Sequence, residues 1–167
     1  MRQSFQKRRR RGAESERLRT SDPILFTEGQ VVDLPVGGLA HGGRGVGRLE
    51  GFVFLVDGAL PGDLVRVRVT RRRPSYAEAE TLEILRPSRQ REEPRCGHQG
   101  ECGGCAWMAL SSEGQLRAKR RLLIDALRKA SGPARIEVSE VLPSPRRFGY
   151  RNHLDLTFGQ REGRLVL

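Results

Sequence analysis

The sequence is poor in several residue types, and each scarcity argues against a class of protein. Aromatic residues make up only 5% of the 167 residues, and cysteine occurs three times. No apolar run approaches the about 18 residues that a membrane-spanning helix needs. No apolar segment follows the basic N-terminus, so the chain does not begin like a secretory signal. We therefore expect a cytoplasmic protein that makes no membrane contact.

Positive charge is what the sequence has in excess. Lys and Arg number 31 against 20 Asp and Glu, which gives a net charge of +11. A chain this basic most often binds a polyanion, and RNA or DNA is the first candidate, with a generally arginine-rich proteome as the alternative. Residues 1–22 are basic and contain almost nothing apolar. We expect them to form a disordered tail that either adds non-specific affinity for phosphates or only solubilises the chain.

Residues 23–86 have the pattern of a small β-barrel. Valines alternate with Arg66 and Arg68 across 64–69, and a short apolar run occupies 52–56. Turn residues at Gly58 and at Pro61-Gly62 separate such runs. Five short strands in about 60 residues, without a long helix, favour a closed barrel because closure hides the strand edges. The expected fold class is an OB-like barrel followed by an incomplete α+β region.

The glycine-rich stretch 37–47 does not have the spacing of a nucleotide-binding loop. Neither G-x-G-x-x-G nor G-x-x-x-x-G-K-[ST] is present, and a strand is expected to follow. The glycines therefore favour a tight hairpin. Nearby, Arg71–Arg73 before Pro74 predict a loop whose guanidinium groups can reach phosphates. Arg66 and Arg68 can equally be the solvated face of a strand.

A polar linker at 86–95 separates the barrel from a second region at 95–167. The second region contains a predicted strand over 148–159, flanked by glycines. That strand would begin a sheet whose remaining strands are not in this chain.

The best helix signal in the chain lies in this second region. Ser112 is the expected N-cap, with Gln115 completing a capping box, and Gly132-Pro133 is the expected end. One face of this helix is apolar and carries Leu116, Leu123, Leu127 and Ala130.

All three cysteines lie within ten residues, as Cys96, Cys102 and Cys105. An odd number in a chain without a signal sequence argues against a disulfide framework. Clustered thiolates can hold one iron–sulfur cluster or one zinc ion, and His98 would complete a Cys3His zinc set. A [4Fe–4S] cluster normally takes four thiolates. The spacing alone leaves both metals open and slightly favours zinc.

The order of these motifs is similar to that of a known family. Leu39–Gly47 and Ala59–Asp63 resemble a TRAM domain, which is an RNA-binding OB-like module. The segments that follow resemble the S-adenosylmethionine-dependent RNA uracil-C5 methyltransferases, over about residues 25–160 in all. They are Pro94-Arg95-Cys96, Cys102-Gly103-Gly104-Cys105, Gln115-Leu116 with Lys119, and Tyr150-Arg151-Asn152.

The resemblance implies the RNA-recognition and cluster-binding N-terminal portion of a 23S rRNA or tRNA methyltransferase. It implies that Cys96, Cys102 and Cys105 bind a [4Fe–4S] cluster with a fourth, downstream cysteine that this chain lacks. The family's catalytic cysteine and S-adenosylmethionine domain have no counterpart here, so we expect this chain alone to be inactive. It would be a fragment or the product of a split gene with a separately encoded methyltransferase half. The alternative is a stand-alone TRAM module with structural zinc.

Six basic residues are the predicted phosphate contacts, chosen for their charge and their expected place in loops. They are Arg44, Arg71, Arg72, Arg73, Lys119 and Arg151.

Overall fold

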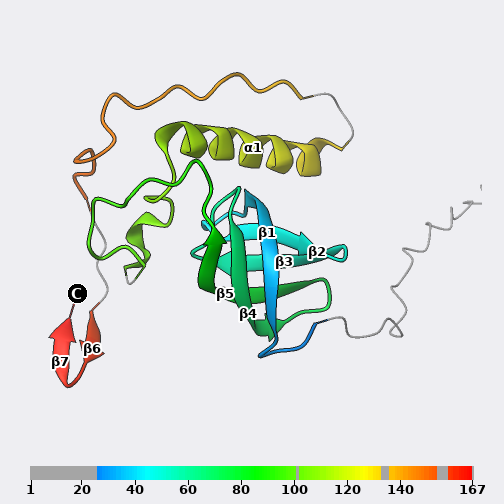
Figure 1. The fold of residues 1–167 in the computed structure, drawn as a ribbon. Coiled ribbons are helices and arrows are strands. Elements are labelled where there is room, and N and C mark those ends of the chain that lie inside the picture. Colours follow the sequence, from blue (N-terminus) through cyan, green and yellow to red (C-terminus); the bar gives the residue numbers. More distant parts are fainter. Residues whose placement is uncertain (1–25, 101, 133–135, 154–157, 167) are drawn as a thin grey trace, which may run out of the picture.

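The computed structural model describes residues 26–100, 102–132, 136–153 and 158–166. The predicted basic tail at 1–22 lies outside the described residues. Five strands form a closed barrel in the order β1-β2-β3-β5-β4 (Figure 1). β3 pairs with β5 in parallel, and the other pairs are antiparallel. The strands are β1 (Val31–Leu39), β2 (Gly45–Leu49), β3 (Phe52–Asp57), β4 (Leu64–Arg72) and β5 (Tyr76–Arg86). The predicted five-stranded, OB-like barrel is confirmed.

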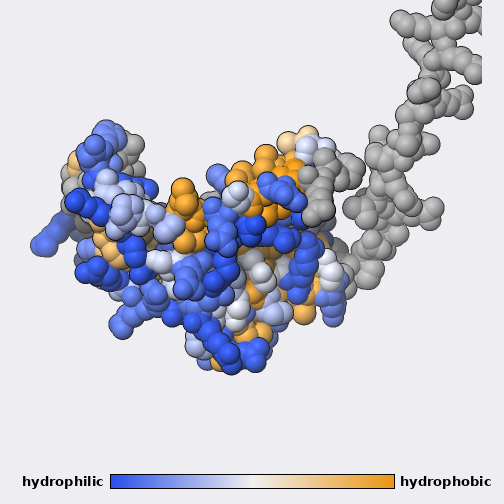
Figure 2. Space-filling model, turned by 90° about the horizontal axis from the view of Figure 1, so that it is seen from above, coloured by the Kyte–Doolittle hydropathy of each residue, from blue (hydrophilic) through white to orange (hydrophobic). Residues whose placement is uncertain are grey.

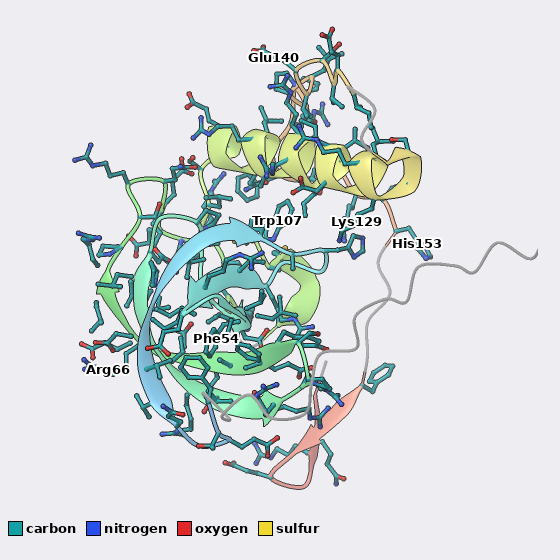
Figure 3. All side chains as sticks on the ribbon, turned by 90° about the vertical axis from the view of Figure 1, so that its right-hand side faces the viewer. Phe54, Arg66, Trp107, Lys129, Glu140 and His153 are labelled. Atoms are coloured by element: carbon teal, nitrogen blue, oxygen red, sulfur yellow. The ribbon has the colours of Figure 1, made fainter. Side chains whose placement is uncertain are left out.

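The period-two pattern of β4 and β5 determines which side chains fill the barrel. Val65, Val67 and Val69 of β4 are buried, whereas the arginines between them face outward. In the register of β3 with β5, the large Phe54 lies opposite the small Ala77. This pairing of large with small residues fills a narrow interior, and Figure 3 shows Phe54 inside the barrel. Phe26 packs into the same core, with its ring centroid 4.9 Å from that of Phe54.

The glycine-rich stretch forms the predicted hairpin between β1 and β2. Gly47 of β2 allows the two strands to approach closely, because a Cβ there would lie 2.6 Å from the Leu34 side chain. The second predicted loop is shorter than expected. Arg71 and Arg72 belong to β4, because the ladder with β5 continues to the pair Arg72–Ala77. The loop prediction for those two arginines was therefore wrong.

The predicted linker at 86–95 is held against the barrel. Asp63, whose side chain is fully buried, accepts hydrogen bonds from the backbone N–H groups of Leu60 and Ser88. It also accepts from Arg91, with Nη2 2.7 Å from Oδ2. Arg91 in turn donates to the carbonyl of Gly58. One buried carboxylate therefore joins the β3–β4 turn to the segment that follows β5.

This segment also pairs with the residues before the helix. The backbone N–H of Glu92 donates to the carbonyl of Ala109, and the backbone N–H of Ser111 donates to the carbonyl of Gln90. Leu110 is fully buried beside Leu60 in a second, small apolar cluster that includes Trp107. Trp107 lies between the helix and the barrel in Figure 3.

The helix α1 (Ser112–Ser131) lies across one end of the barrel (Figure 1). Its N-cap is Ser111, whose hydroxyl accepts from the N–H of Gly114, so the predicted cap at Ser112 was one residue late. Gln115 does not close a capping box. Its amide instead donates to the carbonyls of Trp107 and Leu110. Gly132 ends the helix with φ of 72°. Among the described residues, no helix has the length and apolar content to span a membrane.

The C-terminal segment forms a small hairpin of β6 (Gly159–Arg161) and β7 (Arg164–Val166), set apart from the barrel in Figure 1. The strand predicted over 148–159 is not found at 148–153 or at Phe158, and residues 154–157 lie outside the described part. Two arginines face the Phe148 ring in place of a neighbouring strand. The Arg95 and Arg147 guanidinium carbons lie 4.8 and 5.9 Å from its centroid.

Candidate nucleic-acid interface and cysteine pocket

The outward-facing arginines of β4 differ in how firmly they are paired. Arg66 binds Asp33 of β1 through two hydrogen bonds of 2.9 and 3.1 Å. It reaches Glu83 of β5 at 3.2 Å. The hydrogen bond to Asp33, followed by the charge of that carboxylate, raises the pKa of Arg66 above its ordinary value. Arg68 pairs with Glu80 at 3.2 Å. These two arginines form a charge-paired strand face, as one of the two interpretations of the sequence allowed.

Arg44 and Arg73 share a single carboxylate. Glu78 lies near both, with Oε2 3.9 Å from Arg44 Nη1 and Oε1 3.8 Å from Arg73 Nε. Both distances are too long for hydrogen bonds. Glu78 therefore brings together the end of the β1–β2 turn and the β4–β5 turn, and with them two of the predicted phosphate contacts.

Arg71 and Arg72 differ from their neighbour Arg73. The Arg72 guanidinium carbon lies 4.2 Å from the centroid of the Phe52 ring, a cation–π contact. Its Nε is buried without a hydrogen-bond partner among the described residues. Arg71 is exposed and forms no ion pair within the described part of the chain. The β4–β5 turn thus presents positive charge that acidic neighbours neutralise only in part.

Lys119 and Arg151 lie on other elements. Lys119 is on the exposed side of α1, and Arg151 is exposed in the coil near the C-terminal hairpin. No contact among the described residues connects either of them to the Glu78 group. The six predicted contacts therefore do not form one cluster.

The three cysteines line one open pocket. Cys102 follows a turn in which its N–H donates to the carbonyl of His98 at 2.9 Å, and the short helix η1 (Gly103–Cys105) comes next. We call this open depression the cysteine pocket. It is lined by Cys96, His98, Gln99, Cys102, Cys105 and Met108. All three thiols are exposed and none forms a disulfide.

The chemistry of the cysteine pocket suits a soft metal, because three thiols and one imidazole line it. The side-chain positions do not yet form a ligand set. Among the described residues, which omit Glu101, no group of three or more His, Cys, Asp or Glu side chains is arranged to hold a metal ion. The types of donor fit a soft metal, although these side chains are not positioned as a complete ligand set.

Two important acidic residues were missed by the sequence reasoning. Asp63 was noted only as the last residue of a TRAM-like segment, and Glu78 was not singled out. The alternation that buries Ala77 and Ala79 places Glu78 on the outer face, and that signal was available. The burial of Asp63 had no sequence signal, because it depends on Arg91, 28 residues away.

Comparison with known proteins agrees with the motifs. The TRAM domain family matches residues 25–82. The 23S rRNA (uracil(1939)-C(5))-methyltransferase RlmD of Marinomonas sp. is 36% identical over 158 residues, 95% of this chain and 34% of that protein. RlmD of Aromatoleum aromaticum is 51% identical over 89 residues, 53% of this chain and 21% of that protein. An uncharacterized RNA methyltransferase of Thermosynechococcus vestitus is 36% identical over 142 residues, 85% of this chain and 32% of that protein. The matches thus span between about a fifth and a third of the length of these relatives.

Proposed function

We propose that this chain, which carries a TRAM domain and is homologous to part of the RNA uracil-C5 methyltransferases, is the N-terminal RNA-recognition portion of such an enzyme. The observation that carries the proposal is the 36% identity to an RlmD protein over 95% of the chain. A closed barrel with a basic turn supports it, because OB-like barrels bind nucleic acid on their outer surface and loops.

The proposed substrate is 23S rRNA, with tRNA as the alternative, in the cytoplasm. Both RlmD relatives are named for a uracil of 23S rRNA. A base that is to be methylated must be unpaired or flipped out of its helix. The recognition portion would therefore bind the shape and backbone of the RNA around the target. Base chemistry and S-adenosylmethionine binding would belong to a methyltransferase domain outside this chain, and this chain alone would be inactive.

The proposed RNA surface is centred on the β4–β5 turn. Arg71 and Arg73 would be its principal phosphate contacts. Arg44 belongs to the same surface, because Glu78 lies near both Arg44 and Arg73. Arg72 contributes charge while it stacks on Phe52. Lys119 and Arg151 would bind more distant parts of a larger RNA.

A paired comparison of variants tests this surface. Arg71→Ala/Arg73→Ala should weaken binding of the full chain to a labelled single-stranded RNA. It should also flatten the dependence of log K on log salt by up to about 1.4, since each lost phosphate contact contributes about 0.7. Arg66→Ala/Arg68→Ala removes the same charge from positions of β4 that are paired with carboxylates, and should change the slope much less. Equal slopes for the two variants would exclude the β4–β5 turn from the interface.

We further propose that the cysteine pocket holds a metal centre. Cys96, Cys102 and Cys105 would ligate a [4Fe–4S] cluster whose fourth ligand comes from outside the described residues. Zinc is the second candidate, and the presence of His98 in the same pocket favours it, because Cys3His is a complete zinc set. Either centre would cross-link the loop that precedes α1.

Metal content distinguishes the two candidates. Protein purified without oxygen should contain iron and sulfide and absorb visible light, and exposure to air should remove that absorbance because an incompletely ligated cluster is open to solvent. His98→Ala should leave iron binding unchanged and abolish zinc binding. Cys105→Ser should reduce both. Protein with neither metal under either condition would exclude a metal centre in this chain alone.

A further inference from the structure

Glu78 occupies an unusual place on the barrel surface. Each of its two carboxylate oxygens faces a different arginine, Oε2 toward Arg44 and Oε1 toward Arg73. The two arginines come from different turns, and the Glu78 side chain between them is only 23% exposed. One anionic group with two oxygens therefore lies between two guanidinium groups, as the phosphate of an RNA backbone would.

The contacts of Glu78 are loose compared with those of its neighbours. Glu80 is two residues away on the same outer face of β5, and its oxygen lies 3.2 Å from Arg68. The two Glu78 contacts, at 3.8 and 3.9 Å, fall outside hydrogen-bond distance. Partly exposed ion pairs at such distances stabilise a protein little. Arg44 and Arg73 are therefore available to a better acceptor.

We propose that Glu78 is a resident substitute for an RNA phosphate, and that one phosphate of the bound RNA displaces it and binds Arg44 and Arg73 together. This inference rests on the proposed RNA-binding function. A phosphate group offers guanidinium groups charge-assisted hydrogen bonds, which the Glu78 carboxylate does not form at its present distances. The displaced carboxylate stays near the phosphate and repels it, so Glu78 lowers the affinity for RNA.

Glu78 thereby acts on both affinity and selectivity. A general attraction between a basic barrel and any polyanion is reduced by one negative charge at the centre of the interface. Only an RNA that positions a phosphate between both arginines compensates for the displacement of Glu78. An RNA that passes the turn at another angle meets the carboxylate without that compensation.

Glu78→Gln tests the proposal, with Glu80→Gln as the matched control. Both variants lose one negative charge from the same face of β5, and Gln keeps the size of Glu. In the full chain, Glu78→Gln should tighten binding to a labelled oligouridine by about three- to tenfold at low salt. Glu80→Gln should change it by less than about twofold. An equal gain in both variants, or no gain in either, would overturn the proposal.

A second pair of variants shows where the gain originates. In an Arg44→Ala/Arg73→Ala background, Glu78→Gln should tighten binding no more than Glu80→Gln does in the wild type, because only the general effect of one lost negative charge remains. A gain as large as in the wild-type background would also overturn the proposal. A different result would contradict the proposed function itself. In that case the wild-type protein would not bind RNA even at low salt.

Discussion

The barrel and the region after it differ in where their buried apolar side chains lie. In the barrel, eleven buried residues from Phe26 to Ala79 form one apolar cluster around Phe54. After residue 93, the only buried apolar side chains among the described residues are those of Ala109 and Leu110, and both pack against Leu60 of the barrel. The barrel has its own core, whereas the second region buries its apolar side chains on the barrel.

The apolar face of α1 is also only partly buried, unlike the core of the barrel. Leu123 and Leu127 are 47% and 37% exposed, and Figure 2, which views the α1 side, shows hydrophobic residues at the surface. The three cysteines are exposed as well. The barrel should therefore keep its fold by its own contacts, and the second region should depend on its attachment to the barrel and on any group held in the cysteine pocket.

The largest effect is expected in the barrel core. Phe54→Ala removes a fully buried ring that contacts both Phe26 and Phe52. It should lower the free energy of unfolding by about 3–5 kcal/mol, which is a large part of the stability of a small domain. Denaturant titration followed by circular dichroism measures this change. A loss below about 1 kcal/mol would contradict a barrel that is stabilised by its own core.

The next largest effect concerns the attachment of the second region. Arg91→Ala leaves the buried Asp63 carboxylate without its charged partner. We expect a loss of about 2–3 kcal/mol, less than for a fully buried pair because the Arg91 side chain is 19% exposed. Hydrogen exchange should then increase at residues 88–111 before it increases in β3 or β4. Uniform exchange over the whole chain would mean that the two regions unfold as one.

The barrel was predictable because its signals are local. Alternation in β4, the apolar run of β3 and the glycine turns each depend on a few neighbouring residues, and together they allow only a small closed sheet. The error at Arg71 and Arg72 arose because strand ends depend on the partner strand, and β5 extends the ladder to Arg72. The end of α1 at Gly132 was also local and was predicted correctly.

The candidate site was predictable only in part. The cysteine motif indicated three of the residues that line one pocket, and charge with expected loop position singled out Arg44 and Arg73, which lie on either side of Glu78. The roles of Asp63 and Glu78 follow from contacts between segments distant in sequence, which no local pattern records. The strand predicted from Phe148 is not found at 148–153, because a strand needs a pairing partner and no described strand lies beside this segment.

A third, smaller effect is expected where the β1–β2 turn contacts the second region. A Cβ on Gly43 would lie 2.6 Å from the Cβ of Ala106 and 2.9 Å from the indole nitrogen of Trp107. Gly43→Ala should cost about 1–2 kcal/mol more than Gly42→Ala. Gly42 has a similar positive φ, so it shares the backbone strain, but it has open space around it. Equal losses would show that backbone strain alone accounts for the effect.

Trp107 provides a direct readout of that contact, because it is the only tryptophan in the chain. Gly43→Ala should shift its fluorescence toward that of a solvated indole, whereas Gly42→Ala should not. An unchanged spectrum in Gly43→Ala would place the indole elsewhere in solution.

The smallest effect is expected on the uncovered face of α1. Leu123→Gln and Leu127→Gln replace partly exposed leucines by a residue that keeps helix propensity. Each should change the free energy of unfolding of this chain by no more than about 1 kcal/mol, because each leucine is only partly buried. The same denaturant titration used for Phe54→Ala measures it, so the two regions are compared on one scale. A loss above about 2 kcal/mol would mean that the face is covered in solution, and that the second region has a core of its own after all.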